Sequence, residues 1–270
     1  MPAAVVTGSA RGLGFEIARV LAARGLDVTL TDVDEAALGE AADRLGAART
    51  MALDVRDEDA CRAVAAAAAG DASGPLAVWV SNAGILATGP AWTHGAELRE
   101  RMLAINALGT MNGTLAALER MRPRDSGHIV NVVSLAGLGA PPGETVYAAS
   151  KHAAIAFTLG TLADLRAENV DGVHLSALCP DGIWTPMLYN KLDDPAAAPS
   201  SSGPLPQPEH LAAKVGELLD RPRPVLAMPR SRGVAVRLFD AFPGLAARGT
   251  RLWLADARRR QRRWKKKLER

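Results

Sequence analysis

The stretch "AAVVTGSARGLGFEIARVLAARG", residues 3–25, leads from an apolar run through a glycine-rich turn into an amphipathic segment. Leu13, Ile17 and Leu21 recur every four residues, which is the spacing of one helical face, and Gly25 is a stop signal. The stretch therefore predicts a strand, a turn and a helix, the first unit of a sheet whose strands alternate with helices.

The same alternation continues along the chain. Further strands are predicted at 27–34, 48–55, 75–84, 127–137 and 172–180, and helices at 35–46, 58–70, 95–121, 145–169 and 209–221. Because these strands are continuously apolar, both faces of the sheet are expected to be covered. The predicted fold is α/β: a Rossmann-like, doubly wound parallel β-sheet with helices on both faces, in a single domain.

Composition narrows the class of protein. Of the 270 residues 48% are apolar and 4% aromatic, which favours helices packed closely on a sheet over an all-β fold. Cys61 and Cys179 stand far apart, so no disulfide is expected, and Cys179 lies in an apolar run that predicts a buried thiol. The five histidines are scattered singly, and no metal site is predicted. The N-terminus does not resemble a signal peptide and no run of 18 apolar residues exists, so a cytoplasmic location is expected.

The glycine-rich turn predicts an anion site. Gly8, Gly12 and Gly14 would let the backbone approach a pyrophosphate at a helix N-terminus, where free N–H groups and the helix dipole favour negative charge. Their spacing is Gly-x-x-x-Gly-x-Gly rather than the commoner Gly-x-Gly-x-x-Gly, and a purely structural turn is the alternative.

Asp32, 24 residues after Gly8, ends the second predicted strand. A carboxylate there can accept hydrogen bonds from both adenosine ribose hydroxyls and would repel a 2′-phosphate, which favours NAD over NADP. Arg11 argues the other way, because a cation in the turn could hold that phosphate. We give Asp32 more weight, since its repulsion of the phosphate is direct; a helix-capping role is its alternative.

In "ETVYAASK", residues 144–151, Tyr147 stands one helical turn before Lys151, so the phenol and the ammonium share a face. An unperturbed phenol, with a pKa of about 10, is a poor base at neutral pH. A nearby cation would favour the phenolate and lower that pKa.

Six segments in order resemble the short-chain dehydrogenase/reductase family over about residues 3–186. They are "TGSARGLG" at 7–14, "LDV" with Asp54, "SNAG" at 81–84, "INALGT" with Asn106, "IVNVVSLAG" with Ser134, and "YAASK" with Tyr147 and Lys151. Ser134 precedes Tyr147 by 13 residues, a spacing typical of the family. Ser81 replaces the first Asn of the family's Asn-Asn-Ala-Gly.

The resemblance implies a role for each catalytic candidate. Tyr147 would exchange a proton with the substrate oxygen, and its pKa would be lowered by Lys151 and by a positively charged nicotinamide ring. Lys151 would also bind the nicotinamide ribose. Ser134 would hydrogen-bond the substrate oxygen, its alternative being a strand-end hydroxyl. Asn106 would hold a water that links Lys151 to solvent, its alternative being a helix-bending amide bonded to its own backbone.

The resemblance also implies a nicotinamide cofactor, NAD in preference to NADP. The implied cofactor-binding residues are Gly8, Ser9, Arg11, Gly12, Leu13, Gly14, Asp32, Asp54, Val55, Asn82, Ala83, Gly84, Tyr147, Lys151, Pro180, Ile183 and Thr185.

One departure from the family follows the sixth predicted strand. The family usually has Pro-Gly there, whereas this chain has Asp181 between Pro180 and Gly182. A solvated turn residue is the favoured interpretation of Asp181; a contact with substrate or a narrowed entrance is the alternative.

The substrate-facing residues are predicted to be mostly apolar. They are Leu135, Ala136 and Gly137, the segment 138–144, and Trp184, Met187, Leu188 and Tyr189. We therefore expect an NAD(H)-dependent oxidoreductase that interconverts a secondary alcohol and a ketone on a hydrophobic substrate. The alternatives are a catalytically silent NAD(P)-binding sensor or scaffold, and an epimerase or dehydratase of the same family.

The C-terminal end carries most of the positive charge. Residues 251–270 hold ten Lys/Arg and two Asp/Glu, so this tail contributes +8 to a net charge of +3 and residues 1–250 carry −5. A solvated or partly disordered end is the favoured interpretation, followed by peripheral contact with an anionic membrane and then by nucleic acid.

The chain is predicted to consist of four consecutive segments with no linker between them. Residues 1–186 would form the dinucleotide-binding and catalytic domain, 187–208 a substrate lid or loop of the same domain with a short helix near Met187, 209–250 C-terminal elements and 251–270 the basic tail. A homodimer or homotetramer is expected from the family resemblance.

Overall fold

The computed structural model of the protein describes residues 1–46, 49–69 and 74–269. Within these residues it contains a seven-stranded sheet in the order β3-β2-β1-β4-β5-β6-β7, and every neighbouring pair is parallel. The strands are β1 (Ala3–Thr7), β2 (Asp27–Asp32), β3 (Arg49–Ala52), β4 (Leu76–Ser81), β5 (Gly127–Val132), β6 (Val173–Pro180) and β7 (Val225–Met228). The predicted doubly wound α/β fold is confirmed.

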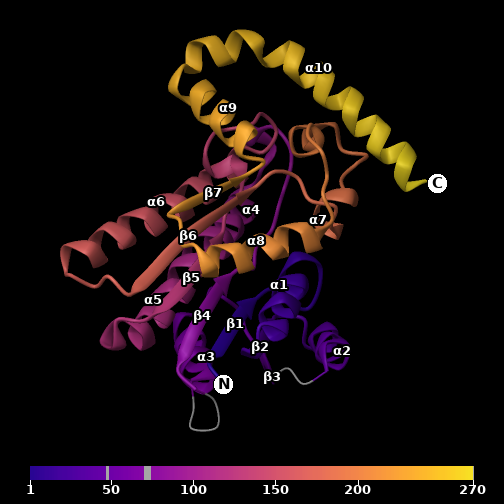
Figure 1. Cartoon of the computed structure of the whole chain (residues 1–270). Coiled ribbons are helices and arrows are strands. Elements are labelled where there is room, and N and C mark those ends of the chain that lie inside the picture. The colour runs from indigo at the N-terminus through magenta and orange to yellow at the C-terminus, as the bar shows by residue number, and fades with distance from the viewer. Residues whose placement is uncertain (47–48, 70–73, 270) are drawn as a thin grey trace.

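The helices follow the predicted pattern up to residue 220 (Figure 1). They are α1 (Gly12–Ala23), α2 (Glu35–Leu45), α3 (Glu58–Ala68), α4 (Ala96–Leu103), α5 (Gly109–Met121), α6 (Thr145–Ala167), α7 (Pro186–Tyr189), α8 (Pro208–Asp220), α9 (Arg230–Ala241) and α10 (Pro243–Leu268). A π-helical turn at Ala104–Leu108 joins α4 to α5, so the helix predicted at 95–121 contains a distortion. Ala48 of a predicted strand, Gly70 of a predicted helix and Arg270 of the tail lie outside the described residues.

Both faces of the sheet are buried, as the apolar strands predicted. Ala4 and Val6 of β1 pack on one face with apolar side chains of α1, α2 and α8. Ala3 and Val5 pack on the other with side chains of α3, α5 and α6. Successive side chains of a strand point to opposite faces, so the apolar run of β1 supplies both faces, whereas β2 alternates Val28 and Leu30 with the buried Thr29 and Thr31.

The strand order reverses at β1. The chain moves from β1 to β2 and β3 in one direction, and then returns to place β4 on the other side of β1. In doubly wound sheets, ligands bind in the crevice outside the carboxyl ends of the strands at this point. The first turn of α1 and the residues after β4 both lie at this crevice.

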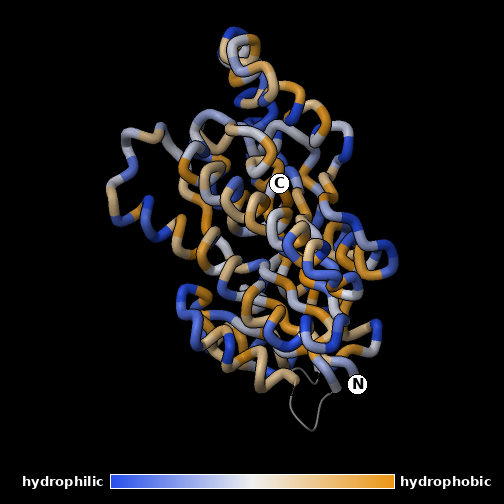
Figure 2. Tube along the Cα trace, turned by 90° about the vertical axis from the view of Figure 1, so that its left-hand side faces the viewer, coloured by the Kyte–Doolittle hydropathy of each residue, from blue (hydrophilic) through white to orange (hydrophobic). Residues whose placement is uncertain are grey.

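The C-terminal region adds elements that were not predicted. The short strand β7 extends the sheet beside β6, and α9 and α10 form an arch at the end of the molecule that also carries the carboxyl ends of the strands (Figure 1). Figure 2 shows this helical pair standing out from the body. Residues 251–268 belong to α10, so this end is helical rather than disordered, and most of its side chains are exposed, in keeping with the solvated end that was favoured. In the described part of the chain, no helix combines the length and apolar character needed to cross a membrane.

Candidate active site

The glycine-rich turn between β1 and α1 forms a close-packed cradle. Gly8 has a φ of +63°, a conformation that side chains disfavour, and a Cβ there would lie 2.8 Å from the Cα of Ala83. A Cβ on Gly14 would collide with the carbonyl oxygen of Gly8 and would lie 2.6 Å from the amide nitrogen of Asn82. The glycines therefore bring the N-terminus of α1 against the crevice, and the turn fits a bound pyrophosphate.

Asn82, just after β4, is hydrogen-bonded to the end of β1 on the other side of the crevice. Its side-chain amide donates to the carbonyl oxygens of Thr7 (3.0 Å) and Gly8 (2.9 Å). The Thr7 hydroxyl in turn accepts from the backbone N–H groups of Asn82 (3.0 Å) and Ala83 (3.1 Å). Ser9 lies behind the turn, where its hydroxyl accepts from the N–H of Thr31 at 2.9 Å. Its side chain thus joins β1 to β2.

Asp32 ends β2 and lines the crevice. Its carboxylate accepts from the backbone N–H groups of Ala10 and Asp34, both at 3.2 Å, which fixes it beside the turn. Arg11 also lines the crevice, and its guanidinium pairs with the Asp34 carboxylate at 2.7 Å. The cation that argued for a 2′-phosphate is therefore already engaged by an acidic neighbour.

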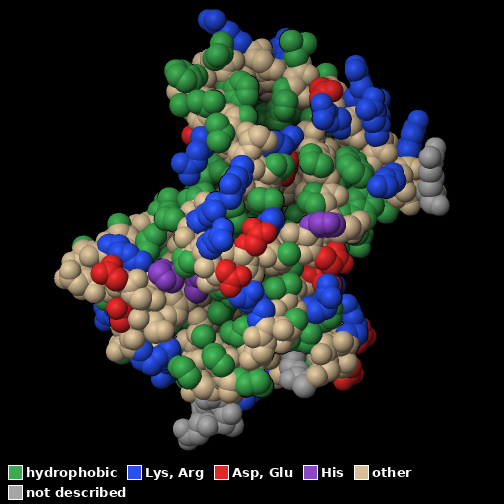
Figure 3. Space-filling view, viewed as in Figure 1, with side chains coloured by type: hydrophobic (Ala, Val, Ile, Leu, Met, Phe, Trp, Pro, Cys, Tyr) green, Lys and Arg blue, Asp and Glu red, His purple; other side chains and the backbone are tan. Residues whose placement is uncertain are grey.

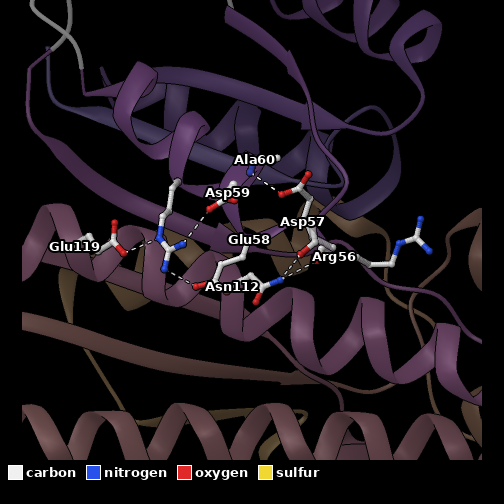
Figure 4. Close-up of polar contacts among 9 residues, drawn as sticks. Arg56, Asp57, Glu58, Asp59, Ala60, Asn112 and Glu119 are labelled. Carbon is white, nitrogen blue, oxygen red and sulfur yellow. Dashed lines mark hydrogen bonds and ion pairs between the residues drawn. The ribbon is translucent and has the colours of Figure 1, made fainter.

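The loop after β3 carries Asp54 and Val55 into the same crevice. Asp57 begins α3 by accepting from the N–H of Ala60 at 2.9 Å, and the Asn112 amide of α5 donates to the carbonyl oxygens of Val55 (3.0 Å) and Arg56 (3.3 Å) (Figure 4). These bonds hold the loop against α5. The Arg56 guanidinium, hydrogen-bonded to Asp54, lowers the pKa of that carboxyl.

Ser134, Tyr147 and Lys151 meet at the carboxyl ends of β5 and β6. Ser134 follows β5, and its hydroxyl accepts from the N–H of Ala136 at 3.1 Å, which starts a short helical turn. Tyr147 and Lys151 lie one turn apart at the start of α6, with the Lys151 nitrogen 5.8 Å from the centre of the Tyr147 ring. All three line the cavity that also contains the glycine cradle.

The charge environment of Tyr147 and Lys151 differs from the one that their spacing predicted. Burial raises the pKa of the Tyr147 phenol, the neighbouring Glu144 carboxyl raises it further, and a hydrogen bond with Ser134 opposes both. Burial also lowers the pKa of Lys151 to about 8. The Lys151 ammonium donates to the carbonyl oxygen of Val132 at 3.0 Å. The protein's own groups therefore favour a neutral phenol, contrary to the lowered pKa that the Tyr–Lys spacing suggested.

Asn106 sits in the π-helical turn and is fully buried. Its amide donates to the carbonyl oxygen of Ile85 (2.9 Å) and to the hydroxyl of Ser150 (3.0 Å), and its oxygen accepts from the N–H of Ile85 (2.8 Å). The alternative of an amide bonded to its own backbone is wrong. A Cβ on Gly84 would lie 3.2 Å from the Asn106 oxygen and 3.6 Å from the Lys151 nitrogen, so the two side chains flank the same residue.

Asp181 is not the solvated turn residue that the sequence favoured. Its side chain is 9% exposed and pairs with the Arg232 guanidinium of α9 at 2.6 Å. Arg232 also donates to the hydroxyl of Ser202 at 2.8 Å. Burial raises the pKa of Asp181 to about 6 even though Arg232 lowers it. Asp181 therefore ties the turn after β6 to α9 and to the loop before α8. Arg232 is 51 residues away in the chain, so the sequence carried no sign of the pair.

Glu144 is a buried carboxyl at the edge of the cavity. It was predicted within the substrate-facing segment 138–144 but was not singled out. Its side chain is 1% exposed, and one oxygen accepts from the N–H of Ser200 at 3.2 Å. Burial raises its pKa to about 7, and the nearby Asp181 and Asp194 contribute in the same direction. The carboxyl thus joins the start of α6 to the loop that covers the cavity.

The cavity has a volume of about 1250 Å³ and two unlike walls. One is the nucleotide crevice. Pro180, Ile183 and Thr185 also line the cavity, and the second wall is apolar. It includes Met187 and Leu188 of α7, which confirms the short helix predicted near Met187, and then Phe239 of α9 with Leu245 and Trp253 of α10. The contribution of α9 and α10 was missed, although the apolar residues in "VAVRLFDAFPGLAARGTRLWLAD" were its signal.

Residues 184–202, part of which lines the cavity, are here called the covering segment, and α10 contacts this segment from outside. The Gln261 amide donates to the carbonyl oxygen of Asp194 at 2.7 Å, and the Trp264 ring lies 5.7 Å from that of Trp184, centre to centre. Lys265 pairs with Asp193. Within the described ranges, no three His, Cys, Asp or Glu side chains gather as a metal site would require.

Known proteins are similar to this chain in both sequence and fold. The family model described as short chain dehydrogenase matches residues 2–196. Cyclopentanol dehydrogenase from a Comamonas species is 35% identical over 204 residues, which cover 74% of this chain and 80% of that protein.

Two solved structures are also similar. A short-chain dehydrogenase/reductase from Burkholderia phymatum in complex with NAD has a TM-score of 0.82 at 28% identity, covering 91% of this chain and 95% of that one. A single-residue variant of actinorhodin polyketide ketoreductase with NADPH has a TM-score of 0.75 at 28% identity, covering 84% and 95%. A family match over most of the chain, together with the shared fold and the site described above, shows that this protein is an oxidoreductase of the short-chain dehydrogenase/reductase family.

Proposed function

We propose that the protein is an NAD(H)-dependent oxidoreductase that interconverts a secondary alcohol and a ketone on a hydrophobic substrate. The observation that carries this proposal is that Tyr147 lines the same cavity as the glycine cradle and the apolar wall. A hydrophobic alcohol on the apolar side and a nicotinamide on the other would meet beside its phenol.

Each catalytic side chain then has a defined task. Tyr147 takes the proton from the alcohol oxygen, or returns it to the ketone oxygen. Ser134 donates a hydrogen bond to the same oxygen and stabilises the charge that develops there. NAD, when bound, supplies the hydride acceptor and a positively charged ring whose field favours the phenolate.

Lys151 lowers the pKa of the Tyr147 phenol through its positive charge. Burial raises the pKa of the phenol, so the protein needs positive charge nearby to make its proton labile. The Lys151 ammonium, 5.8 Å from the ring, provides part of it. In the same proposal, Lys151 binds the nicotinamide ribose and Asn106 holds a water that leads protons from Lys151 to solvent.

The preference for NAD over NADP rests on Asp32 and on the Arg11–Asp34 pair. Asp32 is held at the crevice by two backbone N–H groups and would repel a 2′-phosphate. Because the solved relatives contain either NAD or NADPH, the preference is a property to be measured on this chain. A higher kcat/KM with NADPH than with NADH would overturn our interpretation of Asp32.

The substrate class follows from the apolar wall. Phe239, Leu245 and Trp253 border the cavity, whose volume lies somewhat above the usual range for small-ligand sites. One relative is named for cyclopentanol and one structural neighbour for a polyketide, which suits a cyclic or extended apolar alcohol.

Self-association through α4 and α5 is part of the proposal. Leu103, Leu108 and Leu115 are 39%, 53% and 41% exposed along this helical pair. Two copies could bury these side chains against each other in a homodimer, or in a homotetramer built from two such pairs. Light scattering coupled to size-exclusion chromatography measures the order directly.

The test of the activity compares the two tyrosines of the chain. A panel of secondary alcohols and ketones that includes cyclopentanol is assayed with both cofactors. Tyr147→Phe should lose about 10³-fold or more in kcat while still binding NADH. Tyr189→Phe is the matched control, since Tyr189 of α7, although predicted to face the substrate, is not among the residues that line the cavity and its ring packs on Trp184. Unchanged turnover in Tyr147→Phe would contradict the mechanism, and tight NADH binding without turnover on any substrate would favour a silent sensor.

A further inference from the structure

The outer side of α9 and the start of α10 carry a continuous apolar surface, here called the apolar rim. Its residues are between 39% and 80% exposed and are Val234, Leu238, Phe239, Phe242, Leu245, Leu252 and Trp253. Green side chains gather over this helical pair at the top of Figure 3. Contiguous apolar surfaces of this kind usually mark a site of interaction with a protein or a membrane.

The pattern of α9 explains why the rim faces outward. Gly233 is buried against β7, where a Cβ would collide with Ala227, and Val236 packs against Gly139 and the core below. Val234 and Leu238 lie four residues apart on the other side of the helix and are 61% and 58% exposed. The helix is therefore apolar on two sides, and the body of the protein covers one of them.

Basic residues surround the rim. Arg230, Arg237, Arg248 and Arg251 are exposed along the same segment, together with the acidic Asp240. Further along α10, five exposed cations share one helical face: Arg258, Arg259, Arg262, Arg263 and Lys266. A partner for this surface must accept apolar side chains and offer negative charge.

We propose that the α9–α10 arch docks on an anionic lipid surface, with the apolar rim among the acyl chains and the basic face of α10 against the headgroups. Amphipathic helices with an apolar side and a Lys/Arg-rich side bind such surfaces. Charge complementarity decides the occupant. A second copy of the chain would bring the same cations to the contact, and nucleic acid would leave the apolar rim without a partner.

The rim is also the outer edge of the cavity. Phe239, Leu245 and Trp253 belong to both, so a bilayer under the rim would lie at the mouth that leads to Tyr147. If the proposed function holds, an apolar alcohol dissolved in the bilayer could reach the site without crossing water. Docking itself does not depend on that function, because the rim and the basic face exist without substrate.

The experiment measures vesicle binding of the full-length protein by sedimentation. Vesicles of phosphatidylcholine alone are compared with vesicles that also contain phosphatidylglycerol. We expect binding to the anionic vesicles at least about 10-fold stronger, and lost at about 1 M salt, where the Debye length is about 3 Å. Equal binding to both kinds of vesicle, or to neither, would overturn the proposal.

Two variants separate the contributions. Leu238→Ser/Phe242→Ser removes rim residues that do not line the cavity, and should reduce binding to anionic vesicles by about 10-fold or more. Arg258→Gln/Arg262→Gln should reduce the same binding and its salt dependence. Trp92→Ser is the matched control, since Trp92 is an apolar residue 87% exposed in another loop and should change nothing.

Other occupants give different results. If Leu238→Ser/Phe242→Ser converts an oligomer to a smaller species without affecting vesicle binding, the rim contacts a second copy and the proposal fails. Tighter binding to an oligonucleotide than to anionic vesicles also contradicts it. With cyclopentanol in water, turnover of this variant should equal that of the wild type, so loss of docking is distinguished from failure of the proposed function.

Discussion

Two long helices of this protein have opposite surroundings. α6 (23 residues) buries Val146, Ala148, Ser150 and Lys151 in its first two turns, and more apolar residues beyond. In α10 (26 residues), the buried residues are Ala257 and Gln261. Packing fixes the side chains of α6, whereas most of those of α10 remain available to something outside the chain. A fixed helix suits proton transfer, and an open one suits docking and control of access.

Removing the charge of Lys151 should have the largest effect. Lys151→Met keeps the length of the side chain but leaves the Val132 carbonyl without its donor and Tyr147 without its cation. We expect kcat/KM to fall by about 10³-fold. Because the buried ammonium has a lowered pKa, the free energy of unfolding should not fall in proportion.

The control for this variant is Lys214→Met, whose amine pairs with Glu217 on the surface of α8. A loss of activity that tracks a loss of stability in Lys151→Met would contradict a catalytic role.

Glu144, at the start of α6, should make stability depend on pH. Its pKa is about 7 in the folded protein and about 4.5 when unfolded, so the native state binds the extra proton between these values. Stability from this residue is therefore present below pH 4.5 and is lost as pH rises to 7, by on the order of 3 kcal/mol. Glu144→Gln should remove this loss.

Urea unfolding at pH 5 and pH 8 measures the effect of Glu144→Gln, with the exposed Glu209→Gln as control. If Glu144→Gln and wild type differ by the same amount at both values, the carboxyl does not titrate in this range.

Asp181 attaches α9, the helix that leads into α10, to the turn after β6. Asp181→Asn would leave the Arg232 guanidinium without its carboxylate and loosen the attachment of α9. The free energy of unfolding should fall by about 2 kcal/mol. Hydrogen exchange should report faster opening of α9 than of α6. Uniform opening of both helices would show that the ion pair does not anchor α9 specifically.

The smallest effect is expected at the contact between α10 and the covering segment. Trp264→Ala removes a ring that lies 5.7 Å from Trp184 and should loosen the cover of the cavity. KM for an apolar alcohol should rise about threefold at unchanged kcat, since the loss is of uniform binding. Trp92→Ala is the control. A fall in kcat instead would place α10 in the chemistry rather than in access.

The sheet and its crevice could be predicted because they depend on local signals. Continuous apolar runs, helical spacing and glycine turns repeat in order from residue 3 to residue 180. β7 was missed because "VLAM" is short and lies between prolines, so its pairing with β6 decides its conformation. Asp181 was misjudged because burial and Arg232, a partner distant in the chain, set its charge environment. The pKa of Tyr147 is raised by burial and by Glu144, three residues before it, and neither effect was weighed from the sequence.

Residues 251–268 show how a contact with a segment distant in the chain can stabilise a helix. The basic block suggested a solvated or partly disordered end, yet the same residues form part of α10, which rests on Asp194 and Trp184. The helix is stabilised where it meets the covering segment, and no periodicity within the tail could reveal that contact.

The part of the apolar wall that α9 and α10 supply follows the catalytic residues in the chain. Gly8, Asp32, Ser134, Tyr147 and Lys151 all precede Asp181, whereas the apolar wall of Phe239, Leu245 and Trp253 follows it. Exchange of α9 and the first half of α10 between relatives would therefore alter which molecules enter while leaving Ser134, Tyr147 and Lys151 in place. In this architecture, substrate choice can evolve, or be engineered, as a replaceable module.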